Sequence, residues 1–179
     1  MKKISYSGKK TNEISFPLGG IGTGCIGLLG NGRLADFEIF GKPNKKCLAG
    51  LSFFAVKAEK DGKFIDARIL NTDSESSRTG FEQYADEKDL LFNGYGYGPA
   101  SSTLSGVPHF PSSDFSVSFP YAEMNFSYEK FPGKIKMLAF NPFIPFNDSD
   151  SSIPAAMFEF EIKNDSSDNI DYTLCGALE

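Results

Sequence analysis

Paired carboxylates are the side chains of this sequence whose spacing suits hydrolytic chemistry. Retaining hydrolysis of a glycosidic bond needs two carboxyl groups about 5–5.5 Å apart, one of them with a raised pKa. Glu159 and Glu161 share one face of a predicted strand, about 6.6–6.8 Å apart at Cα. That face alternates with core positions, so we expect a charged exterior and no catalytic pair. Asp36 and Glu38 form a similar pair beside a glycine-rich segment, and we expect a structural role for them, with an interface contact as the alternative.

The glycine-rich segment itself satisfies a nucleotide-binding pattern. Residues 22–27 read Gly-Thr-Gly-Cys-Ile-Gly, the GxGxxG spacing that lets a dinucleotide pyrophosphate approach the start of a helix. The Asn31-Gly32 pair soon after would interrupt such a helix, and Asn-Gly is a strong hairpin signal. We therefore predict an antiparallel pair of strands over residues 21–29 and 33–40, with glycines where another backbone or domain packs closely.

The remaining reactive residue types lack partners for catalysis or metal binding. His109 is the single histidine, so the sequence offers too few suitable side chains for a Ser/His triad or a histidine metal site. We predict that His109 has a structural role. Cys25, Cys47 and Cys175 are odd in number and without the close pairs of a zinc or CxxC motif. We predict three free thiols in a reducing compartment, and neither a metal nor a cofactor.

Charge and hydropathy exclude two classes of partner. Lysine and arginine total 18 against 23 acidic residues, a net charge of −5, so the basic surface that nucleic acid binding requires is missing. Met1-Lys2-Lys3 is followed by a polar stretch where a signal peptide would be apolar. No apolar run approaches the roughly 18–20 residues of a membrane helix. We expect a soluble, cytoplasmic chain.

Short aromatic runs bounded by turn residues predict strands. The sequence holds 18 Phe, 7 Tyr and 18 Gly, and apolar residues alternate along several of these runs. The Asp61-Gly62 pair favours a tight hairpin turn between two of them. The predicted strands beyond the glycine-rich hairpin are residues 51–58, 64–70, 121–128, 135–140, 156–163 and 170–175. The fold class expected is all-β, an antiparallel β-sandwich of two sheets.

Residues 71–105 are rich in Ser, Asp, Glu and Gly and show no sustained apolar period. We expect a long excursion over the surface there, since structureless segments of this length tend to be functional. Tyr95 and Tyr97 within it are candidates for stacking on a sugar.

Three blocks of the sequence resemble one known family. Phe-Pro-Leu-Gly-Gly-Ile-Gly-Thr-Gly-Cys-Ile-Gly at 16–27, continued by Gly-Arg-Leu-Ala-Asp-Phe-Glu-Ile-Phe-Gly-Lys-Pro-Asn at 32–44, is similar to the opening of glycoside hydrolase family 116. That family includes the non-lysosomal bile acid β-glucosidase/glucosylceramidase and bacterial β-glucosidases. Residues 106–110 with 121–123, and residues 139–145 with 151–156, resemble later parts of the family in the same order.

The resemblance implies an N-terminal β-sandwich domain that packs on a later catalytic (α/α)6 domain. The family's nucleophile Glu and acid/base Asp belong to that later domain, and no position of this sequence corresponds to either, so no catalytic residue is assigned. A β-glucoside or glucosylceramide-type substrate would be reached only through the catalytic domain. The candidates for interdomain contact are Gly19, Gly20, Gly22, Gly24, Asp36 and Glu38.

We therefore predict that residues 1–179 form a partial, non-catalytic supporting domain of a retaining β-glucosidase or glucosylceramidase-like hydrolase. The alternative, from a different class, is a free-standing carbohydrate-binding β-sandwich. A sandwich that lacks a neighbouring domain leaves strand edges unpaired, so self-association of the isolated chain is also expected.

Overall fold

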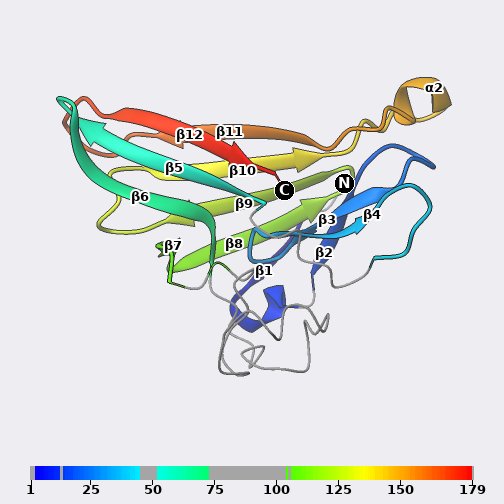
Figure 1. The fold of residues 1–179 in the computed structure, drawn as a ribbon, viewed down its shortest axis with the longest axis horizontal. Coiled ribbons are helices and arrows are strands. Elements are labelled where there is room, and N and C mark those ends of the chain that lie inside the picture. The colour runs from blue at the N-terminus through cyan, green and yellow to red at the C-terminus, as the bar shows by residue number, and fades with distance from the viewer. Residues whose placement is uncertain (1–2, 13, 45–51, 73–103, 105, 179) are drawn as a thin grey trace.

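The computed structural model describes residues 3–12, 14–44, 52–72, 104 and 106–178, and these form strands connected by short turns (Figure 1). Alternation of apolar and polar residues explains most of the strands, because it gives each strand one face for a core and one for solvent. The elements are β1 (Ile4–Ser7), the 3-10 turn η1 (Gly8–Thr11), β2 (Ser15–Leu18), β3 (Cys25–Leu29), β4 (Leu34–Glu38), β5 (Phe53–Lys60), β6 (Lys63–Thr72), β7 (His109–Phe110), β8 (Ser112–Ser118), β9 (Tyr121–Ser127), β10 (Lys134–Phe140), the one-turn helix α2 (Asp148–Ser151), β11 (Met157–Lys163) and β12 (Asp171–Ala177).

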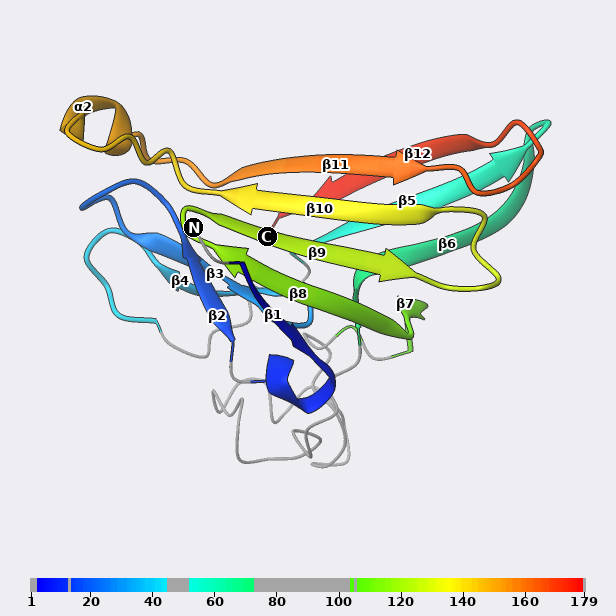
Figure 2. The ribbon, with the colours of Figure 1, turned by 180° about the vertical axis from the view of Figure 1, so that it is seen from behind.

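The strands form two packed layers. One layer is an antiparallel sheet in the order β1-β8-β9-β10-β11. Behind it lie a sheet in the order β12-β5-β6-β7 and a smaller sheet in the order β2-β3-β4 (Figure 2). The β6–β7 pair is parallel and the other strand pairs are antiparallel. The predicted all-β antiparallel sandwich is confirmed, with its second layer divided between two sheets.

A backbone contact joins the two sheets of the second layer. The Thr72 N–H at the end of β6 donates to the Asn31 carbonyl in the β3–β4 turn at 2.9 Å. Gly32 beside it has a φ of +90°, and a Cβ there would lie 2.6 Å from the Leu70 carbonyl oxygen. The Asn31-Gly32 turn therefore closes the predicted hairpin and also seats it against β6.

One apolar cluster fills the space between the layers. The predicted alternation of β9 is confirmed, since Ala122, Met124 and Phe126 are all at most 1% exposed. The Phe110 ring lies 5.6 Å from the Phe126 ring and 5.4 Å from the Phe131 ring, measured between centroids. The cluster also takes residues from the three-stranded sheet, so both parts of the second layer share this core.

The predicted antiparallel β3–β4 hairpin is confirmed, with Leu28 opposite Leu34, but its strands are shorter than predicted. β3 begins at Cys25 because residues 21–24 form a turn, and β4 ends at Glu38 instead of residue 40. No helix begins at Gly24–Gly27, so these glycines do not form a dinucleotide site.

Strand β6 corrects a second boundary, because it continues through Asn71 and Thr72, which were expected to begin a surface excursion. Asn71 is 1% exposed and its side-chain oxygen faces His109 Nδ1, so a polar residue is satisfied inside the fold. Most of that excursion, with Tyr95 and Tyr97, lies outside the described residues.

The two ends of the sandwich differ. At one end lie α2, the β2–β3 loop and the β4 end (Figure 1). At the other end lies the β5–β6 turn, where Asp61 and Gly62 have φ angles of +52° and +72° as the predicted tight turn requires.

Candidate functional site

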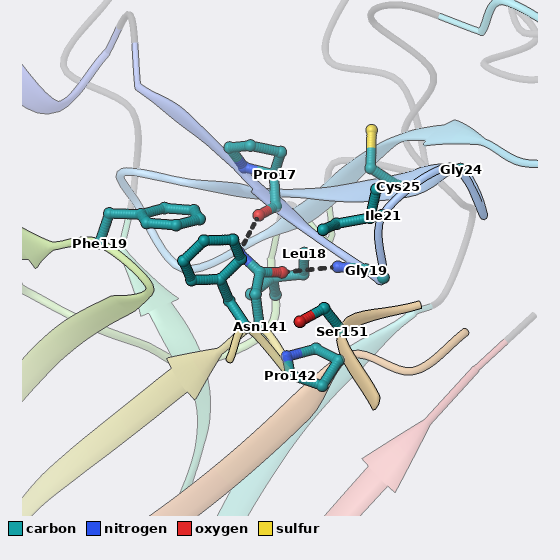
Figure 3. A pocket seen from close by; sticks show the side chains of 12 residues that line it. Pro17, Leu18, Gly19, Ile21, Gly24, Cys25, Phe119, Asn141, Pro142 and Ser151 are labelled. Atoms are coloured by element: carbon teal, nitrogen blue, oxygen red, sulfur yellow. Dashed lines mark hydrogen bonds between the residues drawn. The ribbon is translucent and has the colours of Figure 1, made fainter. Parts of the chain in front are cut away.

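Three segments far apart in sequence meet at the α2 end and surround an open cavity of about 200 Å³ (Figure 3). They are the β2–β3 loop, the turn between β8 and β9, and the segment that follows β10 and contains α2. The lining is mostly apolar and includes Pro17, Ile21, Phe119, Pro142 and Phe143. A second hollow of about 290 Å³ adjoins it and shares Ile21 and Phe143.

The Asn141 side chain links the segment that follows β10 to the end of β2. Its Oδ1 accepts a hydrogen bond from the Gly19 N–H at 2.7 Å, and its Nδ2 donates to the Pro17 carbonyl at 2.9 Å (Figure 3). The side chain is 8% exposed, so these bonds replace most of the water that the amide would otherwise bind. Asn141 thus fixes where the β2–β3 loop leaves its sheet.

The α2 segment is held to the same loop through Ser151. The Ile21 N–H donates to the Ser151 carbonyl at 2.8 Å. The Ser151 hydroxyl, on a residue only 2% exposed, donates to the Ile144 carbonyl at 3.0 Å and accepts from the Ile144 N–H at 2.9 Å. The Asn147 side chain caps α2 by accepting from the Asp150 N–H at 3.1 Å. These bonds give the 144–151 segment one defined position on the loop.

The glycines proposed for interdomain contact have roles within this fold. A Cβ on Gly20 would lie under 3.0 Å from the Ile153 carbonyl, and one on Gly19 or Gly24 would meet backbone oxygens just as closely. Gly22 has open space around its Cβ position but a φ of +72°, which L side chains rarely adopt. The close backbone approach predicted from these glycines is therefore met by the chain itself.

The two carboxylates beside the loop also have partners inside the chain. Asp36 is 8% exposed and accepts a hydrogen bond from the Ser15 hydroxyl at 2.7 Å. Glu38 accepts from the Cys25 thiol at a donor–acceptor distance of 3.8 Å. The first contact joins β4 to β2 across the sheet and the second joins β4 to the adjacent β3, while a contact of this pair with another domain stays a prediction.

Glu159 and Glu161 lie on the outer face of β11, as predicted, and both are exposed. Lys136 on the neighbouring strand forms an ion pair with Glu161. The hydrogen bond to Glu161 raises the pKa of the Lys136 ammonium. A charged exterior therefore accounts for this pair of glutamates.

His109 has a structural position in β7. Its Nε2 lies 3.0 Å from the Leu104 carbonyl oxygen, and its Nδ1 faces Asn71. Neither Cys25 nor Cys175 forms a disulfide in the described structure, and Cys47 lies outside the described residues. Within the described part of the chain, no three His, Cys, Asp or Glu side chains gather as a metal site would require.

Large apolar side chains gather around the mouth of the cavity. We call the following set the apolar end surface: Ile21, Phe119, Phe143, Ile144, Phe146 and Ile153. Phe146 is fully exposed at 109% and Ile21 is 56% exposed, while the Phe119 and Phe143 rings pack edge-on at 5.3 Å. Contiguous exposed apolar surface of this kind marks a site of protein interaction more often than an ordinary surface. The sequence-based candidates include none of these six residues, because exposure depends on the tertiary arrangement.

The geometry defines a class of protein: a β-sandwich domain whose glycine-rich loop and α2 segment build a rigid, apolar end. Residues 15–179 match the sequence model of a family described as beta-glucosidase 2, glycosyl-hydrolase family 116 N-term. The chain belongs to this family of N-terminal domains of glycoside hydrolase family 116. Among curated proteins, none matches the chain significantly. No helix in the described part of the chain is long and apolar enough to cross a membrane.

Proposed function

We propose that this chain is the non-catalytic supporting domain of a family 116 β-glucosidase and that it binds the catalytic domain through the apolar end surface. The observation that carries the proposal is the fully exposed Phe146 beside Ile144 and Ile21, on a framework that hydrogen bonds hold in place. Burying one large apolar side chain contributes roughly 1.5–3 kcal/mol, so a few such residues supply a stable interface.

The proposed division of labour follows from the positions of the acidic residues. Asp36 and Glu38 bond within the domain, and Glu159 and Glu161 face solvent on the outer face of β11. A glycosidase needs a general acid and a nucleophile on opposite sides of one glycosidic bond. We therefore assign β-glucoside or glucosylceramide-type substrates to the catalytic domain alone. We also assign the chain a cytoplasmic location, in which Cys25 and Cys175 stay reduced.

Binding to a separately produced catalytic domain of a family 116 β-glucosidase tests the proposal. Phe146→Ser should weaken that binding at least about tenfold, which corresponds to about 1.4 kcal/mol. Phe64→Ser is the matched control, because Phe64 is 65% exposed near the β5–β6 turn at the opposite end. Equal affinity of the two variants would contradict the assigned surface, and absence of binding by the unchanged chain would contradict the supporting role.

The same preparation tests the division of labour. The chain alone should not hydrolyse a chromogenic aryl β-glucoside, with or without Glu159→Gln or Glu161→Gln. Turnover by the pure chain that these substitutions abolish would make it an enzyme. Retention of the chain on an immobilised β-glucan, without affinity for the catalytic domain, would instead favour a free-standing carbohydrate-binding sandwich.

A further inference from the structure

The Asn31-Gly32 pair in the β3–β4 turn has a covalent chemistry besides its role in the hairpin. Because glycine has no side chain, its backbone nitrogen can approach the side-chain carbon of a preceding asparagine without a clash. Attack of the Gly32 nitrogen on Asn31 Cγ forms an N–Cγ bond and a cyclic imide. The Cγ–Nδ2 bond breaks, and ammonia leaves with the proton of the Gly32 N–H. Water then opens the imide at either carbonyl and gives aspartate or isoaspartate.

The folded turn keeps the Gly32 nitrogen from this reaction. Its N–H donates to the Leu29 carbonyl at 2.9 Å, and the Leu29 N–H donates to the Arg33 carbonyl at 2.8 Å. The Asn31 Oδ1 accepts from the Arg33 N–H at 3.3 Å, which restrains the side-chain amide. Attack on Asn31 Cγ requires loss of the Gly32 proton and rotation of the Asn31 backbone, so the bond from Gly32 to Leu29 must break first.

The contact of this turn with β6 opposes that rotation. The Thr72 N–H donates to the Asn31 carbonyl at 2.9 Å, so the peptide group between Asn31 and Gly32 is held at its oxygen as well as at its nitrogen. Gly32 is buried, and its Cβ position lies 2.6 Å from the Leu70 carbonyl oxygen and 3.2 Å from the Phe126 ring. The turn therefore has no space to change shape while it stays against β6.

We propose that Asn31 is a deamidation site that the fold protects. The β3–β4 turn blocks the reaction while it lies against β6, and each movement of the hairpin away from β6 permits it. Isoaspartate inserts an additional carbon into the main chain between Asn31 Cα and the Gly32 nitrogen, so the product cannot restore the bonds to Thr72 and Leu29 together. Deamidation thus records, irreversibly, a separation of the three-stranded sheet from the four-stranded sheet. This proposal does not depend on binding to the catalytic domain.

Mass spectrometry of tryptic peptides measures the reaction, because conversion of an amide to an acid changes the peptide mass. The sequence has a second such pair, Asn93-Gly94, in a different tryptic peptide. In urea both pairs should react at similar rates. In the folded chain at the same pH, Asn31 should react at least about a hundredfold more slowly than in urea, which corresponds to an opening free energy of about 2.8 kcal/mol. Circular dichroism verifies that the chain is folded, and a folded-chain rate within about threefold of the urea rate would overturn the proposal.

Hydrogen exchange of the Thr72 amide identifies the movement that permits deamidation. This N–H is bonded to the Asn31 carbonyl, so it becomes free to exchange when the hairpin leaves β6. Over urea concentrations below the unfolding transition, the Asn31 deamidation rate and the Thr72 exchange rate should rise in parallel. If deamidation proceeded while the Thr72 amide stayed protected, opening of the turn alone would be sufficient, and the role assigned to β6 would be wrong.

A pair of variants separates local opening from global unfolding. Thr72→Pro removes the donor to Asn31 and leaves the Asn-Gly pair unchanged. Phe160→Leu is the matched control, because Phe160 lies in β11 at the edge of the facing sheet and packs on Phe54.

The two variants are compared at equal free energy of unfolding, which is adjusted with urea. Thr72→Pro should then deamidate at Asn31 at least about tenfold faster than the control. Equal rates would mean that only global unfolding exposes Asn31, which would contradict protection by β6. Phe126→Leu removes the ring atom closest to Gly32 and supplies the same comparison if the proline variant does not fold.

The stability of the product tests whether the change is irreversible. Anion-exchange chromatography enriches the deamidated chain, here with Asn93→Gln so that Asn31 belongs to the single Asn-Gly pair, and peptide mapping gives its isoaspartate content. After removal of urea, the isoaspartate form should have a lower Tm than Asn31→Asp, which has the same charge on an unaltered main chain. Equal Tm values would show that the turn accepts the longer main chain, and the irreversible step would be refuted.

Discussion

Replacing Asn141 by alanine should destabilise the chain far more than its position beside an open cavity suggests. The substitution removes two hydrogen bonds, one from the Gly19 N–H and one to the Pro17 carbonyl. Each contributes about 1 kcal/mol net, and a buried group left unsatisfied costs about 1–3 kcal/mol. The adjoining cavity lets water reach part of this site, so we expect a loss of about 2–3 kcal/mol in the free energy of unfolding. For a domain of this size that lowers Tm by roughly 4–12 °C.

Urea unfolding and calorimetry of three variants separate the hydrogen bonds from other effects. Asn141→Asp keeps the acceptor for the Gly19 N–H but sets a carboxylate oxygen against the Pro17 carbonyl oxygen in a buried site, so at neutral pH it should cost at least as much as Asn141→Ala. Asn125→Ala is the control, because that exposed amide donates only to the Glu123 carboxylate, at 3.1 Å, and should change stability by less than about 0.5 kcal/mol. The reasoning is refuted if Asn141→Ala costs no more than Asn125→Ala.

Four further variants have expected outcomes. Gly20→Ala should cost about 1–3 kcal/mol because its Cβ meets the 153 backbone, and Gly22→Ala about 1 kcal/mol from strain alone, both read from urea unfolding. Burial raises the pKa of the Tyr172 phenol, so its neutral form contributes stability that is fully present below about pH 10. This stability is lost as pH rises through the raised pKa. Tyr172→Phe should therefore remove the loss of stability at alkaline pH, as measured in pH-dependent melts. The Lys3 hydrogen bond lowers the pKa of the Glu123 carboxyl, so this pair contributes stability that is present above about pH 4.3 and is lost as pH falls through the lowered pKa. Lys3→Met should therefore reduce the pH dependence of the free energy of unfolding at acid pH, by less than about 1 kcal/mol.

Local patterns in the sequence were sufficient for the hairpins. The Asp61-Gly62 and Asn31-Gly32 turns, and the alternation along β9 and β11, each depend on residues close together in the chain. The predicted strand ends at residue 70 because the polar stretch from Asn71 onward has no sustained apolar period, yet Asn71 is buried in β6 beside His109, which the parallel β6–β7 pair brings alongside. A single sequence does not reveal where tertiary contacts override the local conformational preference of a residue.

The candidate site was predictable only in part for the same reason. The glycines between β2 and β3 indicated that some backbone packs closely there, but not which one. For Gly20 the partner is the segment around Ile153, more than a hundred residues later, whereas Gly19 and Gly24 meet backbone nearby in the sequence. Asn141 and Ser151 carry no signal of their own, because a polar residue after a strand usually belongs to a solvated turn. Their roles follow from a long-range meeting of segments that no local period encodes.

The family-like sequence blocks meet at the α2 end of the sandwich, and this meeting helps to explain which residues lie there. The first block supplies Gly19, Gly20 and Ile21, and the third supplies Asn141 and Ser151, and backbone or side-chain hydrogen bonds join the two blocks directly. If the junction between these two blocks served only the stability of the domain, the hydrogen bonds and the glycines would be sufficient.

The joint also presents Phe146, Ile144 and Ile21 to solvent, and their exposure costs the isolated domain the free energy that burial would provide. A rigid framework and an unburied apolar surface occur together where a second protein surface is to be held in a fixed orientation, because preorganisation reduces the entropy lost on binding. That combination, rather than the glycine pattern by itself, supports the interdomain contact. It also predicts a result that would not follow if this junction served only the stability of the domain. Asn141→Ala should weaken binding of the catalytic domain, although the buried Asn141 side chain does not contact that domain.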